Sequence, residues 1–438
     1  MQQPNIKVGL LLASEVHFQL RGKFSSPTSN ANANYTASVQ QGKISLQSSD
    51  GSCSLHESIC FEPTEELDSF LIHDVVIGID FHWEQKKDLI YKGSMMLTLE
   101  SGKIRVINCV PLEEYLRSVI SSEMSAKSPQ NLLKAHAVIS RSWLVAQVLK
   151  SNKLEGTSYH TVHNGGDEYI RWYDREDHEG FDVCADDHCQ RYQGITEIIN
   201  EKVDAAISET FGEFLVSHGE ICDARFSKCC GGVSESFHTV WEPVQHAYLL
   251  PVRDAQSAQE LPPLQEENAA KRWIETSPDA FCNTTDQQIL SQVLPDFDQS
   301  TPDFYRWRVK YTQREMAELI RKRSGVDYGA ILKLEPMERG ASGRIIKLKI
   351  VGSKCTRVIG KELEIRRTLS ASHLYSSAFV VKTEGDDDIP LSFELIGAGW
   401  GHGVGLCQIG AAVMGEKGYS YLAILQHYFK GAKLEKRY

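Results

Sequence analysis

Two amphipathic helices predicted in close succession within residues 110–145 constrain the fold of this chain more than any other segment. In the first, apolar residues recur at helical spacing and must face a core; they are Leu112, Tyr115, Leu116, Val119 and Ile120. The second is expected to open with Ser128 as N-cap and Pro129 at the first helical position. Its apolar side includes Leu132, Leu133, Val138 and Leu144. The segment therefore predicts a packed helical pair with a short polar break between its members.

Three charged residues on these helices are candidates for function. Glu123 lies where the first helix ends, so a packed element holds it at a solvent-accessible edge, and we take it as the candidate reactive carboxylate. Lys134 and Arg141 share one face of the second helix, about 10 Å apart along its axis. Two cations in that arrangement suit an extended ligand with anionic or hydroxyl-rich groups. The alternative is that all three residues are ordinary surface charges.

A group of imidazole and thiol side chains follows between residues 177 and 194. His178, Cys184 and Cys189 are residue types that zinc prefers as ligands, although their spacing is not that of a zinc finger. Asp187 and His188 lie in the same segment and could replace one of them. A disulfide or two free thiols in a loop are the alternatives to a metal site.

A glycine-rich run at residues 397–405 follows a strand-like segment and precedes a predicted helix. It lacks the Gly-Lys-Ser/Thr of a phosphate-binding loop and the three-glycine spacing of a dinucleotide-binding turn. Alternating glycines instead allow a backbone to approach another chain or a ligand closely. His402 is then the candidate functional side chain, followed by Gln408, with a purely structural hydrogen-bonding role for His402 as the alternative.

The order of predicted elements indicates an α+β fold with a mixed β-sheet core and the two-helix motif. We expect a β-rich accessory region over residues 1–98 and the first part of the core over residues 99–254. A helical insertion is expected over residues 255–330, with helices in ENAAKRWIE and REMAELIRKRSG. The second part of the core, residues 331–438, is expected to carry strands in IIKLKIVG, GKELEIRRTLS and LSFELIG and a C-terminal helix near 418–429.

Composition excludes some classes of function. The 438 residues carry a formal net charge of -11 and no strongly basic run, which argues against general nucleic-acid binding. No apolar run is long enough to cross a bilayer. We recognise no export leader at the amino terminus, so we expect either a leader that has been removed or action inside the cell. The 11 cysteines are compatible with both compartments.

Three blocks, in order along the chain, resemble the stage II sporulation protein D (SpoIID) and LytB family. The first is the helical segment VPLEEYLRSVISSEMSAKSPQNLLKAHAVISR, which departs from the family pattern at Ser125, where Pro is usual, and at His136, where Gln is usual. The second is DHEGFDVCADDHCQRYQG, and the third is GAGWGHGVGLCQIGAAVMGEKGYSYLAILQHYFKGAKL. A weaker similarity covers FSKCCGGVSESFHTVW.

This resemblance implies a peptidoglycan lytic transglycosylase that cleaves glycan strands and leaves 1,6-anhydro-N-acetylmuramic acid ends. In that reading Glu123 is the general acid/base, His178, Cys184 and Cys189 hold Zn²⁺, and the substrate contacts are Lys134, Arg141, Tyr192, His402 and Gln408. The resemblance also implies a place in the cell envelope and an amidase or another wall enzyme as a possible partner. Two alternatives remain, namely a zinc-dependent wall hydrolase and a non-catalytic wall-binding protein that enhances an amidase.

Overall fold

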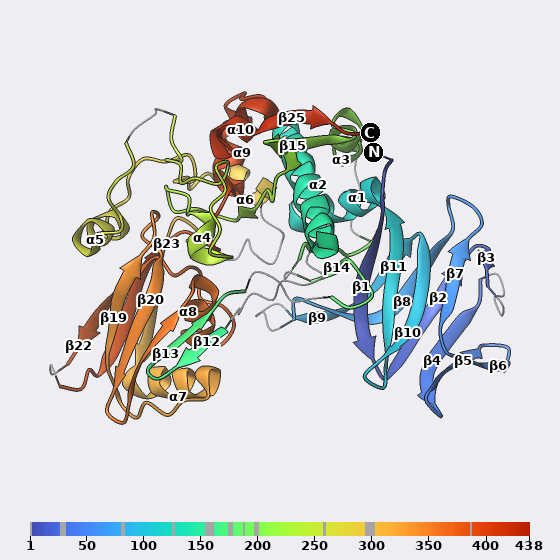
Figure 1. Cartoon of the computed structure of the whole chain (residues 1–438), viewed down its shortest axis with the longest axis horizontal. Coiled ribbons are helices and arrows are strands. Elements are labelled where there is room, and N and C mark those ends of the chain that lie inside the picture. Colours follow the sequence, from blue (N-terminus) through green and yellow to red (C-terminus); the bar gives the residue numbers. More distant parts are fainter. Residues whose placement is uncertain are drawn as a thin grey trace.

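The computed structural model has an α+β fold, as the sequence predicts. It describes residues 2–26, 32–79, 84–124, 128–153, 162–173, 178–186, 189–196, 201–256, 260–293, 303–385 and 388–438. Figure 1 shows a β-rich lobe formed by the N-terminal residues, a central group of helices, and a second β-rich lobe formed largely by residues after 300. No helix in these ranges is long and apolar enough to span a membrane.

Two six-stranded sheets share one apolar core in the N-terminal lobe. The alternation of buried and exposed side chains along β2 explains this packing, because Val16, Phe18 and Leu20 point to one side. The first sheet has the order β14-β1-β11-β10-β7-β3, with β14 (Val183–Cys184), β1 (Asn5–Ala13), β11 (Lys103–Pro111), β10 (Ser94–Glu100), β7 (Ile59–Pro63) and β3 (Phe24–Ser25). The second has the order β6-β5-β4-β2-β8-β9, with β6 (Cys53–His56), β5 (Lys43–Ser48), β4 (Asn34–Gln40), β2 (Glu15–Arg21), β8 (Ser69–Ile77) and β9 (Gln85–Lys92).

The N-terminal sheet continues beyond the boundary at residue 98 that the sequence suggests. Strand β10 spans that boundary, and β11 pairs antiparallel with β1 from Asn5↔Pro111 to Ala13↔Ile104. The short strand β14, with Cys184 at its end, then adds to β1 in parallel. The β-rich region therefore forms one sheet with the segment that leads into the first helix and with part of the His/Cys segment.

The predicted helical pair is confirmed as α1 (Leu112–Glu123) and α2 (Gln130–Lys153). All nine apolar residues that the periodicity assigns to the core are fully buried. Around them lie α3 (Glu201–Glu209), α4 (Phe237–Val240), α6 (Gln287–Val293), α9 (Gln408–Glu416) and α10 (Tyr421–Tyr428). The same region contains the three-stranded sheet β16 (Glu220–Ile221), β15 (Glu213–Ser217) and β25 (Lys433–Lys436), and the parallel pair β17 (Phe226–Ser227) and β24 (Leu406–Cys407).

The second lobe is built on two further sheets. One has the order β12-β13-β21-β20-β19, with β12 (Val162–Gly165), β13 (Glu168–Arg171), β21 (Thr356–Gly360), β20 (Ile345–Gly352) and β19 (Ile331–Arg339). The other has the order β18-β23-β22, with β18 (Arg306–Thr312), β23 (Ser392–Ala398) and β22 (Phe379–Glu384). The remaining helices are α5 (Glu267–Glu275), α7 (Gln313–Ser324) and α8 (Glu362–Thr368).

Two local predictions in this lobe need correction. The predicted helical insertion does contain α5, α6 and α7, but it also supplies β18, whose partner β23 lies far along the chain. The segment GKELEIRRTLS was predicted as a strand and instead forms α8. There Arg366 pairs with Glu362 one helical turn away at 3.5 Å, and both acidic residues Glu362 and Glu364 are buried.

Candidate functional site

Glu123 is the last residue of α1, at the point where the packed face of that helix ends. Its side chain is partly buried, and its Oε1 accepts a hydrogen bond of 2.9 Å from the backbone N–H of Arg191. A segment nearly seventy residues away in the chain thus helps to orient the carboxylate. Residues 125–127, which follow it, lie outside the described ranges, and Ser125 is among them.

His178, Cys184 and Cys189 come together, as the sequence predicts for a metal site. Their ligand atoms all lie within 4.8 Å of one another, and the three residues are partly exposed. His178 Nε2 is 3.2 Å from Cys189 Sγ, and the backbone N–H of Cys184 donates to the same sulfur at 3.4 Å. Pairing of β14 with β1 fixes Cys184, while the ring of Phe181 stacks on His178 with 4.7 Å between centroids.

The His/Cys cluster lies beside Glu123. Cys189 is two residues from Arg191, whose amide binds the Glu123 carboxylate. The buried Tyr115 of α1 lies near both groups. Burial raises the pKa of its phenol, and the charges of the nearby Cys189, Cys184, Tyr192 and Glu123 raise that pKa further. Its hydroxyl also donates to Gln190 Oε1 at 3.4 Å. A carboxylate and a set of potential metal ligands therefore occupy one region.

The donor set suits zinc. One imidazole and two thiols are ligand types that Zn²⁺ prefers, and three protein ligands leave one coordination position for water or a further residue. A hydrogen bond from Cys184, together with burial, raises the pKa of the Cys189 thiol well above its usual value when no cation is present. The alternative ligands Asp187 and His188 lie outside the described residues.

The predicted stripe of two exposed cations on α2 is not formed. Arg141 is 0 % exposed and donates through Nε and Nη2 to the Glu113 carboxylate at 2.9 and 2.8 Å. Lys134 is partly exposed and forms an ion pair with Glu209 of α3. We therefore correct the assignment of Arg141 as a substrate ligand, since a buried guanidinium that already binds a carboxylate cannot reach a glycan.

Tyr192 and Gln408 are also too deeply buried for the substrate contacts assigned to them. Tyr192 is 3 % exposed, stacks on Tyr115 with 5.0 Å between ring centroids, and donates to Asn108 Oδ1 at 2.6 Å. Gln408 is 2 % exposed, and its Nε2 lies 3.1 Å from Nε2 of the buried His136. Both residues stabilise the region behind the site, because their polar groups are engaged within the protein.

His402 lies at a partly exposed position in the glycine-rich run. Its Nδ1 accepts a hydrogen bond of 3.0 Å from the Val404 amide, and its ring packs edge-on against Trp241 with centroids 4.9 Å apart. Burial and then the charges of Arg225 and Arg344 lower the pKa of this imidazole well below its usual value. A neutral ring with Nδ1 as acceptor carries its proton on Nε2. The imidazole also hydrogen-bonds to the Phe226 backbone, so both ring nitrogens are engaged within the protein.

Arg225 is a residue of this region that the sequence does not single out. Its guanidinium lies 4.2 Å from the ring centroid of Trp241 and donates to Asp223 at 2.7 Å. Its charge also acts on both His402 and Cys189. No periodicity or spacing in the sequence marks Arg225.

Two family models match this chain. Residues 100–216 match the stage II sporulation protein model (SpoIID), and residues 235–405 match a domain of unknown function, DUF8618. The chain carries a SpoIID domain. An uncharacterized protein of Brachyspira hyodysenteriae is 23% identical over 94% of this chain and 85% of its own length. Stage II sporulation protein D of Bacillus subtilis is 22% identical over 75% of each chain.

A third relative is the amidase enhancer of Bacillus subtilis, which is 24% identical over 73% of this chain but only 40% of its own length. The SpoIID domain contains Glu123 and all three residues of the His/Cys cluster. His402 lies in the second matched region, and Gln408 lies beyond it. The candidate site is therefore concentrated in the region that matches the SpoIID model.

Proposed function

We propose that this chain is a lytic transglycosylase that cleaves the glycan strands of peptidoglycan at the cell envelope. The observation that carries the proposal is the placement of Glu123 at the end of a packed helix, with its carboxylate oriented by the Arg191 amide. One carboxyl group is sufficient for this reaction, because the C6 hydroxyl of N-acetylmuramic acid is an internal nucleophile. Ordinary glycosidases need a second carboxylate at a defined separation.

In the proposed reaction Glu123 first donates a proton to the glycosidic oxygen. It then accepts the proton of the attacking C6 hydroxyl, and the product carries a 1,6-anhydro end in place of a reducing end. The Arg191 amide orients the carboxylate throughout. His178, Cys184 and Cys189 would hold Zn²⁺. The ion would either stabilise the fold of this segment or polarise a bound oxygen.

The proposal is tested by digesting purified glycan strands and identifying the ends of the products by mass spectrometry. The wild type should release fragments with anhydro ends. Glu123→Gln should reduce that rate by roughly 10²–10⁴-fold, the range expected for loss of a general acid/base. Glu114→Gln is the matched control, since Glu114 lies on the same helix and forms an ion pair with Arg117.

Two other functions are distinguished by the same digestion. Reducing ends that disappear after chelation would replace the proposal with zinc-dependent hydrolysis, a reading favoured by the position of the His/Cys cluster beside Glu123. The name of the amidase enhancer relative suggests a non-catalytic role on an amidase. No product from glycan, together with faster release of peptides by an added amidase, would favour that role.

A further inference from the structure

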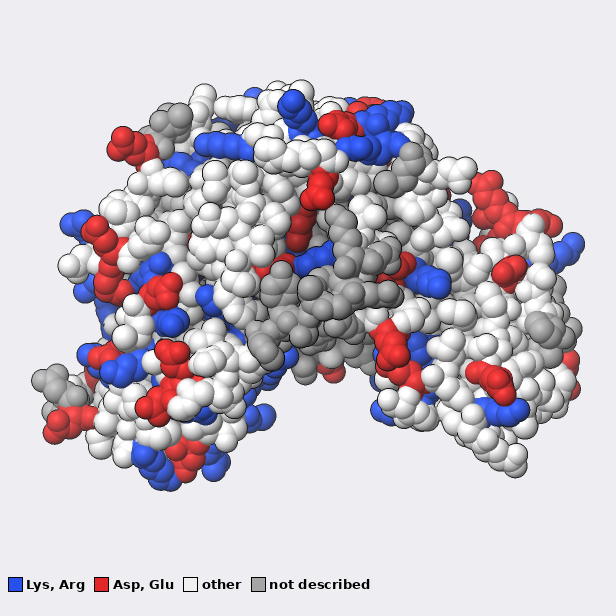
Figure 2. Space-filling view, in the orientation of Figure 1, with Lys and Arg blue, Asp and Glu red and all other residues white. Residues whose placement is uncertain are grey.

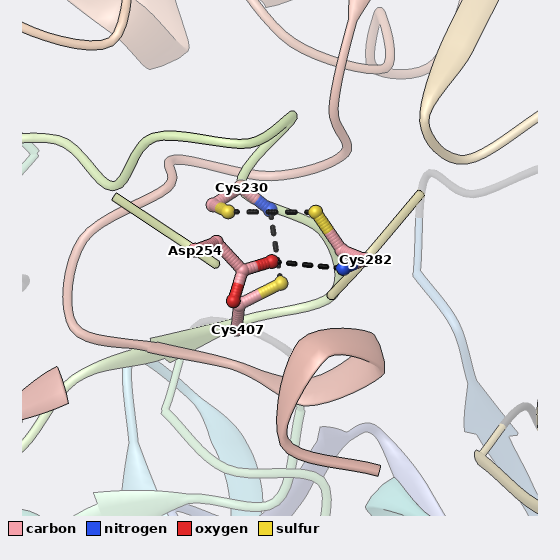
Figure 3. Close-up of side chains that lie close together, drawn as sticks. All are labelled: Cys230, Asp254, Cys282 and Cys407. Atoms are coloured by element: carbon pink, nitrogen blue, oxygen red, sulfur yellow. Dashed lines mark hydrogen bonds between the residues drawn. The ribbon is translucent and has the colours of Figure 1, made fainter. Parts of the chain in front are cut away.

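A second group of potential ligands lies in the protein interior, outside the SpoIID domain. It consists of Cys230, Asp254, Cys282 and Cys407, and all four residues are buried. Their ligand atoms lie within 4.8 Å of one another. Figure 3 shows the three sulfurs and the carboxylate directed toward one another from separate stretches of chain.

The sulfur separation fits a shared cation better than a disulfide. Cys230 Sγ and Cys282 Sγ are 3.6 Å apart. A disulfide would bring them to about 2.05 Å. Two thiolates on a tetrahedral zinc ion, each about 2.3 Å from the metal, would lie roughly 3.8 Å apart.

Backbone N–H groups are directed at two sulfurs of this group, those of Cys407 and Cys230. The amide of Cys230 donates to Cys407 Sγ at 3.2 Å, and the amide of Gly232 donates to Cys230 Sγ at 3.4 Å. Such donors favour the ionised form of a thiol, which is the form that binds a metal. The region is therefore arranged to accept negative charge on sulfur.

Asp254 supplies the strongest argument for a cation. This carboxyl group is 0 % exposed, and it forms no salt bridge with the described residues. Its Oδ2 accepts from the Cys282 amide at 2.9 Å and its Oδ1 from the Tyr428 hydroxyl at 2.7 Å. Buried carboxylates normally pair with a cationic side chain or coordinate a metal, and the neutral donors of Cys282 and Tyr428 provide neither.

Gly410 leaves the space that this arrangement needs. A Cβ atom at Gly410 would lie 2.5 Å from Asp254 Oδ1 and 2.5 Å from the Tyr428 hydroxyl oxygen. Any larger residue at this position of α9 would displace the hydrogen bond that orients the carboxylate. The absence of a side chain here is thus consistent with a site that requires a fixed geometry.

We propose that Cys230, Cys282, Cys407 and Asp254 form a closed, structural Zn²⁺ site. Three soft sulfur ligands and one carboxylate suit zinc, and complete burial leaves no position open for substrate. Cys230 lies in the loop after β17, Asp254 and Cys282 come from the two sides of α5, and Cys407 precedes α9. The ion therefore joins the insertion to the glycine-rich run that carries His402.

The test measures zinc bound by the full-length chain, purified under reducing, oxygen-free conditions. A Cys184→Ser/Cys189→Ser variant removes the exposed cluster, and it should retain one zinc ion per chain after extensive dialysis. Replacement by Co²⁺ in this variant should produce the absorption of a cobalt ion with several thiolate ligands. Adding Cys407→Ser or Asp254→Asn should remove the metal or weaken its retention at least tenfold.

One cysteine substitution is the control. Cys222→Ser changes another buried thiol of the same core and should leave the zinc content unchanged. Absence of zinc from the Cys184→Ser/Cys189→Ser variant, loss of zinc in Cys222→Ser, or a Cys230–Cys282 disulfide in the purified protein would overturn the assigned site.

Discussion

At the scale of single residues, burial decides what each polar group of the two-helix motif can do. His136 takes the position where the family usually has Gln, and it lies fully buried against Gln408 and Ser140. Burial, together with the charge of Lys228, lowers the pKa of its imidazole to about 3. This side chain therefore stays neutral in the folded protein at every pH near neutrality.

His136 makes stability depend on pH. In the unfolded chain its pKa returns to about 6.5. Between these values the unfolded state binds a proton that the folded state does not, so stability falls as the pH drops below about 6.5, by up to roughly 1.4 kcal/mol per pH unit. When urea unfolding is measured from pH 4 to 8, His136→Gln should reduce the pH dependence of the unfolding free energy by the amount that corresponds to about one bound proton. The exposed His17 changed to Gln controls for loss of a histidine, and an unchanged slope in His136→Gln would contradict the prediction.

At the scale of elements, strand pairing in the N-terminal sheet positions the His/Cys cluster. Strand β14 pairs with β1 at Val8↔Val183 and Gly9↔Cys184, and it carries one of the two thiols. A Cβ atom on Gly9 would lie only 2.6 Å from the ring of Phe181, and that ring stacks on His178. The first strand of the chain therefore acts on a ligand more than 150 residues away.

Gly9→Ala should weaken metal binding at the His/Cys cluster by about tenfold or more, because Phe181 must move and His178 with it. The measurement is a competition with a chromophoric chelator. Phe181→Ala alone and the double variant complete the cycle, and the double variant should match Phe181→Ala because the clash has been removed. If the effects of the two substitutions on metal affinity add in the double variant, or if Gly9→Ala binds the metal with wild-type affinity, Phe181 does not transmit the change.

At the scale of the whole molecule, a buried charge network connects the helical pair with the C-terminal end of the chain. Arg141 binds Glu113 through two hydrogen bonds, and the Tyr438 hydroxyl donates to Glu113 Oε1 at 2.6 Å. Figure 1 shows the two ends of the chain close together above α1. Figure 2 shows acidic and basic side chains interspersed over the described part of one face.

Breaking the buried Arg141–Glu113 pair should destabilise the molecule much more than breaking the partly exposed ion pair that Lys134 of the same helix forms with Glu209. Arg141→Ala leaves Glu113 as a buried charge and should cost about 3–5 kcal/mol of unfolding free energy. Lys134→Ala removes a partly exposed ion pair with Glu209 and should cost about 0–1 kcal/mol. Denaturant titrations of the two variants provide the comparison, and equal losses would argue against a structural role for Arg141.

The sequence by itself determined the features that depend on near neighbours. Helical periodicity placed the buried face of α1 and α2, and the short spacing of His178, Cys184 and Cys189 indicated a common site. Local alternation was not sufficient for α8, where a strand-like pattern forms a helix that places Ile365 in the apolar core of the second lobe and pairs Arg366 with Glu362 at i,i+4 spacing.

Only the tertiary structure decided which charged and thiol groups share an environment. Arg141 looked like a surface cation until Glu113, on another helix, proved to be its buried partner. Cys230 and Cys407 are 177 residues apart, yet the amide of one binds the sulfur of the other. The reason is physical: periodicity records which side of an element faces the core, whereas the free energy of a buried charge depends on partners that arrive from any part of the chain.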